Sequence, residues 1–183
     1  LAEHASNTLP WFEVAKHTGA IIKYIDLDEE GKVTLENVRK AVTEHTKIIS
    51  LAQITNVLGY LAPIKEICNF AHEHDIIVCV DGAQSAPHHA VDVQDLDVDF
   101  FAFSGHKMCG PTGVGVLYGK YHLLEEMTPT RFGGGSNARY NSCGLVKLKN
   151  APTKFETGTP NIEGVIGLGS AIEYLQNIGM KNI

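Results

Sequence analysis

The chain has 183 residues, a length that suits one domain with a buried core. Asp and Glu number 21 against 15 Lys and Arg, so the formal net charge is −6 and non-specific nucleic-acid binding is disfavoured. A hydrophobic content of 44% and a charged content of 20% are those of an ordinary globular protein, and the apolar runs are too short to span a membrane. We therefore expect a soluble globular protein with no nucleic-acid and no membrane partner.

The cysteines and the start of the chain bear on the compartment. The four cysteines, Cys68, Cys79, Cys109 and Cys143, form no C-x-x-C pair, which disfavours a zinc or disulfide framework. Residues 1–4 include neither an initiator Met nor the basic and apolar regions of a secretory signal. We expect a cytoplasmic protein whose chain is clipped at its start.

The first half of the chain alternates strand-like and helical segments. Runs rich in β-branched residues predict strands at 20–25, 47–51 and 76–80. Between them, apolar residues at helical spacing predict a helix that begins after Thr34, a typical N-cap residue, and a second helix at 64–71. The run at 76–80 is continuously apolar, as is typical of a parallel strand in a βαβ unit with a right-handed crossover.

The second half of the chain is expected to extend the sheet. Two further strands are predicted at 98–103 and 113–118, around a glycine-rich turn. The segment 131–160 is rich in Gly, Asn and Lys and has little periodicity, which predicts a long loop or a projecting hairpin. A helix is expected at 165–175, and Gly179 is placed to end it. Together these elements predict an α/β fold with a mostly parallel sheet and helices on both faces.

Polar residues follow three of the predicted strands at the point where each strand ends. Asn56 follows the second strand, Asp81 and Gln84 follow the third, and the run Ser104-Gly105-His106-Lys107 follows the fourth. In open α/β sheets, ligands bind beyond the carboxyl ends of the parallel strands. We therefore expect these side chains to face one crevice.

Asp81 and Lys107 indicate the chemistry of that crevice. A carboxylate directly after a buried strand needs a cation or hydrogen-bond donors, although the spacing from Asp81 to Gln84 also suits a helix cap. Lys107 follows a strongly apolar strand, where desolvation favours the neutral, nucleophilic amine that forms a Schiff base; a surface lysine is the alternative. The neighbouring glycines match no dinucleotide or phosphate loop. A lysine, an acid and phosphate-binding polar groups match what pyridoxal 5′-phosphate (PLP) requires.

Five stretches, in family order along the chain, resemble the SUF-type (group II, NifS-like) cysteine desulfurases. These are class V aminotransferase-like PLP enzymes of fold type I. The stretches are Glu3-His4, 50–63, 80–84, 103–107 and 156–161. The resemblance implies that residues 1–183 are the central part of the PLP-binding large domain, with the N-terminal segment and the C-terminal small domain absent.

The resemblance also implies roles around the cofactor ring. Lys107 would form the Schiff base and later move protons, and Asp81 would keep the pyridinium nitrogen protonated. Gln84 would bond the phenolic oxygen, and His4 would stack on the ring and take part in proton transfer. Asn56 would face the ring and the substrate carboxylate.

The implied phosphate site draws on two subunits. Ser104 and His106 would bind the phosphate within one chain, while Thr159 would reach the phosphate of the neighbouring subunit, which implies a homodimer. No metal is implied. The pair His88-His89 is interpreted as a solvated turn, because adjacent residues rarely face one ligand together and no carboxylate cluster accompanies them.

The activity that the resemblance implies is conversion of L-cysteine to L-alanine and an enzyme persulfide, whose sulfur passes to an acceptor protein for iron–sulfur cluster assembly. In the family, the persulfide cysteine and the arginine that grips the substrate carboxylate lie beyond this segment. Cys109 and Cys143 are therefore not assigned that role, and the chain alone is expected to be inactive.

Other functions stay open from the sequence. The nearest alternative is selenocysteine lyase, which acts on L-selenocysteine. Aminotransferase, epimerase and kynureninase activities are more distant, and the glycine-rich insert at 133–157 favours the SUF-type desulfurase. A non-catalytic remnant acting as a structural module is an alternative of a different class.

Overall fold

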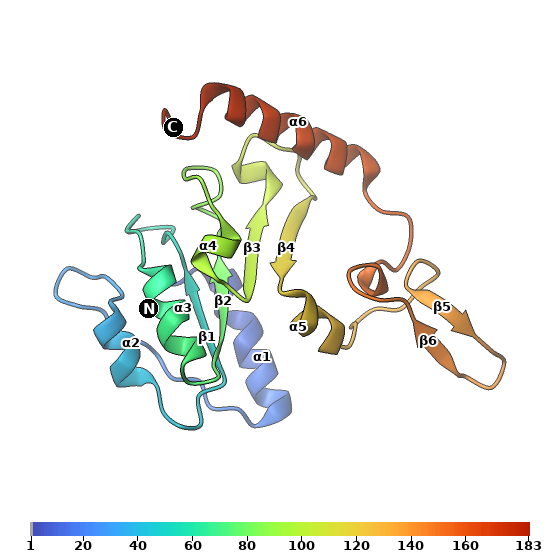
Figure 1. Cartoon of the computed structure of the whole chain (residues 1–183), viewed down its shortest axis with the longest axis horizontal. Helices are drawn as coiled ribbons and strands as arrows, with labels where there is room; N and C mark the ends of the chain where they lie inside the picture. Colours follow the sequence, from blue (N-terminus) through green and yellow to red (C-terminus); the bar gives the residue numbers. More distant parts are fainter. Residues whose placement is uncertain (1) are drawn as a thin grey trace.

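A four-stranded sheet forms the centre of the computed structural model, which describes residues 2–183 (Figure 1). In order across the sheet, the strands are β1 (Ile48–Ala52), β2 (Ile77–Asp81), β3 (Phe100–Ser104) and β4 (Gly115–Gly119). The first three strands run parallel, and β4 runs antiparallel to β3. The predicted α/β fold with a mostly parallel sheet is confirmed.

One face of the sheet is buried under α2 (Leu35–Ala41), α3 (Ile64–His72) and α4 (Val93–Leu96). The apolar residues of α3 recur at helical spacing, so one side of the helix packs against the sheet. Helix α3 connects β1 to the parallel strand β2, as in the predicted βαβ unit. Thr34 caps α2 as predicted, because its hydroxyl accepts a hydrogen bond from the Asn37 N–H at 3.2 Å. The core between these layers includes Val38, Ile67, Val78, Val80 and Phe101.

The opposite face of the sheet is contacted by the start of the chain, where η1 (Ala5–Asn7), a single 3-10 turn, precedes α1 (Leu9–Thr18). Side chains alternate along a strand, so Ser50 points away from the buried Leu51. The Ser50 hydroxyl donates to Oδ1 of Asn7 at 2.7 Å. Leu117, which lies on this second face, stays 54% exposed. The two faces are thus covered to very different extents.

The chain beyond β4 forms a projecting hairpin and a long helix (Figure 1). The hairpin confirms the prediction for 131–160, and Gly179, with φ of +87°, ends the last helix as predicted. No helix within residues 2–183 combines the length and apolarity that crossing a membrane requires. In chain order the elements are α5 (Tyr121–Glu126), β5 (Asn137–Tyr140), β6 (Val146–Leu148), η3 (Thr153–Phe155) and α6 (Ile162–Ile178).

Two stretches near the start of the chain differ from the sequence predictions. The run at 20–25 is not a strand: among the described residues it pairs with no other segment, and Ile21 is 90% exposed. A segment with high strand propensity forms a strand only when a neighbouring segment pairs with it through backbone hydrogen bonds. Conversely, α1 is not among the predicted elements, although Pro10 near its start and Gly19 after its end, with φ of +74°, are typical helix boundaries.

Candidate active site

The carboxyl ends of β1, β2 and β3 meet at one edge of the sheet, here called the carboxyl edge. The register pairs Ala52 with Asp81 and Asp81 with Ala102, so the loops after the three strands leave the sheet side by side. The amide Nε2 of Gln84 donates to Oδ1 of Asn56 at 2.6 Å, which joins the loop after β1 to the loop after β2. The predicted residues of the three loops therefore lie at the same edge.

Asp81 is the last residue of β2 and is half-buried. Its Oδ1 accepts a hydrogen bond from the Ala83 N–H at 2.8 Å, which closes a turn; no helix begins at Asp81, so the helix-cap alternative is wrong. Gly82 makes the turn possible, because a Cβ there would lie 2.1 Å from the Phe101 ring. Within residues 2–183, no hydrogen bond reaches the second oxygen, Oδ2, which leaves this oxygen able to accept one from a ligand.

Lys107 lies in η2 (Gly105–Lys107), the turn directly after β3. Two backbone hydrogen bonds fix this turn: the Gly105 N–H donates to the Val114 carbonyl at 2.9 Å, and the Gly105 carbonyl accepts from the Gly110 N–H at 2.9 Å. Lys107 is half-buried, and in the part of the chain that the structure describes its amine makes no hydrogen bond or ion pair. Lys107 therefore lies at the carboxyl edge with an amine that has no partner among the described residues.

Helix α6 packs against the lysine turn from outside the sheet. A Cβ added at Gly105 would lie 2.9 Å from Cγ1 of Val114 and 3.3 Å from Cδ1 of Leu168, so only glycine fits between these groups. Leu168 also packs with Met108, the residue after Lys107. The last helix of the chain thus packs against residues on both sides of Lys107, Gly105 and Met108.

Ser104 precedes the lysine turn and His106 lies within it. Ser104 is half-buried at the end of β3, His106 is exposed, and neither side chain forms a hydrogen bond with another described residue. Both can still donate to an anion such as a phosphate group. Thr159 differs from them: it is exposed in the link between η3 and α6, and its side chain forms no hydrogen bond to the carboxyl edge within residues 2–183.

His4 caps η1 beside the end of β1. Its Nδ1 accepts a hydrogen bond from the Ser6 N–H at 3.2 Å, and the residue is exposed. The adjacent Glu3 accepts a hydrogen bond from the Ala52 N–H at 2.9 Å, which ties this part of the chain to the last residue of β1. His4 is therefore held near the carboxyl edge. Sequence reasoning gave Glu3 no role of its own, and its only signal was its place beside His4.

The residues of the carboxyl edge fit PLP in chemical type. Among residues 2–183, the loops that follow the parallel strands bring to one edge an amine without a partner, a carboxylate with one free oxygen, and a hydroxyl and an imidazole that form no hydrogen bond. This is the set that an imine-forming cofactor with a ring nitrogen and a phosphate requires. The fit rests on the types of group and on their shared edge.

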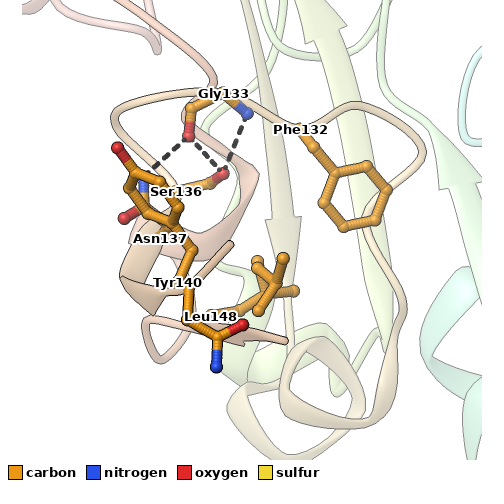
Figure 2. Close-up of a pocket in the computed structure, with 8 residues that line it drawn as sticks. Phe132, Gly133, Ser136, Asn137, Tyr140 and Leu148 are labelled. Atoms are coloured by element: carbon orange, nitrogen blue, oxygen red, sulfur yellow. Dashed lines mark hydrogen bonds between the residues drawn. The ribbon is translucent and has the colours of Figure 1, made fainter. Parts of the chain in front are cut away.

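Two cavities lie away from the carboxyl edge. One, of about 330 Å³, lies against the hairpin; Figure 2 shows Phe132 and Tyr140 on its wall, with the Ser136 hydroxyl bonded to the Gly133 carbonyl at 2.9 Å. The other, of about 300 Å³, lies at the opposite edge of the sheet and includes His72 in its lining. Neither of these two cavities includes Lys107.

The four cysteines are free and fall into two classes. Burial raises the pKa of the Cys68 thiol to about 12 and raises that of Cys79 as well, which keeps both thiols protonated. Cys109 and Cys143 are exposed, and among residues 2–183 neither thiol forms a hydrogen bond. No contact in this part of the chain activates a thiol as a nucleophile.

Known proteins resemble this chain over its whole length. A probable cysteine desulfurase from Halalkalibacterium halodurans is 52% identical over 183 residues, covering 99% of this chain and 44% of that protein. A cysteine desulfurase from Haloferax volcanii is 44% identical over 181 residues, covering 99% of this chain and 42% of that protein. The chain thus spans less than half the length of the curated relatives it matches.

Solved structures agree with the relatives found by sequence. The cysteine desulfurase CsdA from Escherichia coli is 42% identical, with a TM-score of 0.95 over 99% of this chain and 45% of that one. A NifS-like protein is 26% identical, with a TM-score of 0.79 over 97% of this chain and 44% of that one. The family model for aminotransferase class V matches residues 1–183. The chain belongs to the class V aminotransferase family.

Proposed function

We propose that this chain is the central part of the PLP-binding large domain of a cysteine desulfurase. The observation that carries the proposal is that Lys107, in the turn directly after β3, lies at the same edge of the sheet as Asp81 and the hydrogen-bonded Asn56–Gln84 pair. Relatives named cysteine desulfurase, at 44% to 52% identity, support the choice of reaction within the family. The reaction would convert L-cysteine to L-alanine and an enzyme persulfide.

Two residues of the chain would hold the cofactor and control its protons. Lys107 would attach the cofactor through Nζ and, once released, move protons to and from the substrate carbon. Asp81 would use its free oxygen to keep the ring nitrogen protonated. When bound, PLP supplies an electron sink that stabilises negative charge next to the amino group during cleavage of the C–S bond.

The remaining candidates would bind and orient. Ser104 and His106 would hold the phosphate, and the Asn56–Gln84 pair would fix the phenolic oxygen and the substrate carboxylate. His4 would stack on the ring.

The proposal extends to parts of the enzyme outside this chain. Thr159 would reach the phosphate of a second copy, which makes the active enzyme a homodimer. The sulfur would leave on a cysteine outside these residues, and an acceptor protein would carry it to iron–sulfur cluster assembly. We place the reaction in the cytoplasm, where the thiols it requires stay reduced.

Trapping of the cofactor lysine tests the proposal. The intact protein is mixed with PLP and reduced with borohydride, and peptide mass spectrometry locates the phosphopyridoxyl group. We expect one dominant adduct on Lys107, its loss in Lys107→Ala, and alanine formation from L-cysteine only by the unmodified protein. Adducts scattered over exposed lysines such as Lys16, or an equal yield in Lys107→Ala, would overturn the assignment. Comparing sulfide release with selenide release from L-selenocysteine then separates the two lyase activities.

A further inference from the structure

We propose that Glu3 is a positioning residue that fixes the imidazole of His4 at the carboxyl edge. The inference rests on the proposed function, since His4 meets a cofactor only there. It concerns a residue that the cofactor itself does not touch. Three links connect Glu3 to His4: the end of β1, the side chain of Asn7, and the backbone of η1.

The carboxylate of Glu3 uses both of its oxygens. Oε1 accepts the Ala52 N–H at 2.9 Å, and Oε2 accepts Nδ2 of Asn7 at 2.7 Å. Ala52 ends an edge strand whose outer N–H groups have no neighbouring strand among residues 2–183. A half-buried N–H of this kind costs free energy unless a side chain accepts from it. Glu3 therefore joins the start of the chain to β1 at the place where the strand needs an acceptor.

Asn7 extends the network to the face of the sheet. Its Oδ1 accepts the Ser50 hydroxyl at 2.7 Å, while its Nδ2 donates to Glu3. The orientation of the amide is consistent throughout, because a hydroxyl donates to its oxygen and a carboxylate accepts from its nitrogen. Two residues of β1 thus hold the start of the chain: Ser50 bonds to Asn7 in η1, and Ala52 bonds to Glu3.

The turn held in this way fixes His4 on both its backbone and its ring. The His4 carbonyl accepts from the Asn7 N–H at 2.8 Å and from the Thr8 hydroxyl at 3.3 Å. Nδ1 accepts from the Ser6 N–H at 3.2 Å, so in a neutral ring the proton lies on Nε2. Nε2–H is then the donor that the ring presents. Without Glu3, the anchor that sets the direction of this turn is lost.

The side chain of Glu3 is suited to this role by charge as well as by length. A carboxylate accepts two donors at once, whereas the amide of Gln would set its NH₂ group against Nδ2 of Asn7 unless that amide also turned over. Glu3→Gln therefore keeps one acceptor and weakens the second link. Glu3→Ala removes both links.

The test reads the ring of His4 directly in the intact protein without cofactor. ¹⁵N NMR of the imidazole reports the tautomer and the order of the ring, with His4→Gln used to assign the signal. We expect a single ordered Nε2–H tautomer in the unmodified protein, an averaged and mobile ring in Glu3→Ala, and an intermediate state in Glu3→Gln. Asn7→Ala, which leaves the bond between Glu3 and Ala52 in place, should give a smaller change in the same direction.

Glu13→Ala is the matched control. Glu13 is an acidic residue of α1, and among residues 2–183 its carboxylate pairs only with Lys16, at 2.5 Å, on the exposed surface. Its removal should leave the His4 signal unchanged. An ordered His4 ring in Glu3→Ala, or equal disorder in Glu13→Ala, would overturn the inference.

The cofactor-loaded enzyme gives a second, separable readout. With PLP bound, Glu3→Ala should lower kcat at least about tenfold, since small displacements of a positioned group cost rate, while the Lys107 adduct still forms. If Glu3→Ala disorders the His4 ring but the unmodified protein forms no Lys107 adduct, the proposed function is wrong and the positioning role of Glu3 is supported. If the Lys107 adduct forms but Glu3→Ala changes neither the order of the His4 ring nor kcat, the proposed function is supported and the positioning role of Glu3 is wrong.

Discussion

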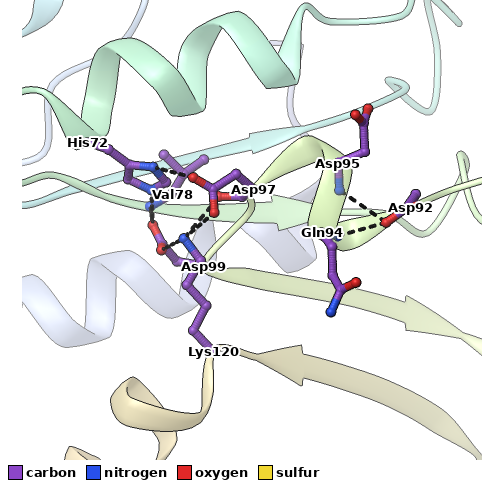
Figure 3. Close-up of polar contacts among 8 residues, drawn as sticks. All are labelled: His72, Val78, Asp92, Gln94, Asp95, Asp97, Asp99 and Lys120. Atoms are coloured by element: carbon purple, nitrogen blue, oxygen red, sulfur yellow. Dashed lines mark hydrogen bonds and ion pairs between the residues drawn. The ribbon is translucent and has the colours of Figure 1, made fainter.

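The two edges of the central sheet carry charged residues that are used in opposite ways. At the edge where β2 and β3 begin, here called the amino edge, Asp99 accepts hydrogen bonds from the Val78 N–H at 2.7 Å, from Nε2 of His72 at 2.9 Å and from Nζ of Lys120 at 2.9 Å (Figure 3). Asp97 takes the second nitrogen of His72 at 3.1 Å and Lys120 at 2.7 Å. The carboxylates of Asp97 and Asp99 and the amine of Lys120 all have partners there, whereas at the carboxyl edge the Lys107 amine has none among residues 2–183.

This difference separates stabilisation from binding. A buried charge is costly unless partners surround it, and the Asp99 side chain is only 7% exposed. The network at the amino edge connects α3, β2 and the ends of β3 and β4, so it holds the sheet together. The carboxyl edge keeps unpaired groups, which the rest of the fold must hold in place and which a ligand can complete.

The pKa shifts at the amino edge agree with a satisfied network. Burial alone would raise the pKa of Asp99, but the hydrogen bond from Val78 and those from His72 and Lys120 leave it lowered. The hydrogen bond from Lys120 lowers the pKa of Asp97. Burial alone would lower the pKa of Lys120, and its bonds to the two carboxylates leave it raised. All three groups are held in their charged forms.

Breaking the network at the amino edge should have the largest effect on stability. Asp99→Ala leaves the Val78 N–H without its acceptor and removes one of the two carboxylates that His72 and Lys120 contact, so it should lower the free energy of unfolding by about 3 kcal/mol or more. Urea denaturation of the intact protein measures this change. Asp95→Ala is the control, because the Asp95 side chain is 62% exposed and, within residues 2–183, pairs only with Lys65, so its loss should cost less than about 1 kcal/mol. Equal losses for the two variants would remove the proposed distinction between the edges.

A change at the carboxyl edge should reverse this pattern. Asp81→Asn keeps an oxygen for the Ala83 N–H but removes the charge that would face the ring nitrogen, so we expect activity to fall at least about 10²-fold with little change in unfolding. Asp92→Asn is the control: Asp92 also caps a turn, accepting from the N–H groups of Gln94 and Asp95, but it lies at α4 (Figure 3). Activity should survive there. Full activity in Asp81→Asn would contradict the cofactor assignment.

Gly82 links the core to the carboxyl edge and should show a mixed effect. Alanine at this position would place a Cβ 2.1 Å from the Phe101 ring, so the turn after Asp81 or the ring must move. We expect Gly82→Ala to cost about 1 to 3 kcal/mol and also to weaken PLP binding. Gly134→Ala, where nothing lies within 4 Å, is the matched control. An unchanged unfolding midpoint in Gly82→Ala would show that the contact is not as tight as described.

The smallest expected effect is on the acid side of the stability profile. A carboxylate whose pKa is lowered on folding stabilises the protein above its unfolded pKa of about 4, and this contribution is lost as the pH falls through the lower folded pKa. Asp97 and Asp99 should therefore steepen the loss of stability below about pH 4. Asp99→Asn should flatten this limb, as followed by denaturation at a series of pH values. A limb of unchanged slope would assign acid unfolding to other groups.

The sequence predicted correctly those strands and helices whose formation depends mainly on the spacing of nearby residues. The apolar run at 76–80 and the spacing of α3 specify a buried strand and an amphipathic helix wherever they occur. The run at 20–25 has the same strand composition, but pairing depends on a neighbour that its own residues do not encode. The shared edge of Asp81 and Lys107 was predictable because parallel strands end together.

Contacts between distant residues were not predictable in this way. Glu3 meets Ala52 across 49 positions, and Asp99 meets His72 across 27. Their partners are set by how the crossovers place the strand ends, and a single sequence does not report such distances. The sequence therefore predicted that the candidate residues share one edge of the sheet, but it did not predict distant contacts such as the one between Glu3 and Ala52.

The order of the core along the chain bears on how the protein is made. The buried members of the main core lie between Val33 and Phe101, and the parallel strands are complete at Ser104. Leu168, which packs over the lysine turn, is synthesised much later. During translation we expect the sheet and its helices to condense while the hairpin and α6 are still in or behind the ribosomal tunnel. The nascent chain would then expose Lys107 before its final packing partner exists, so cofactor capture would belong to the end of biogenesis.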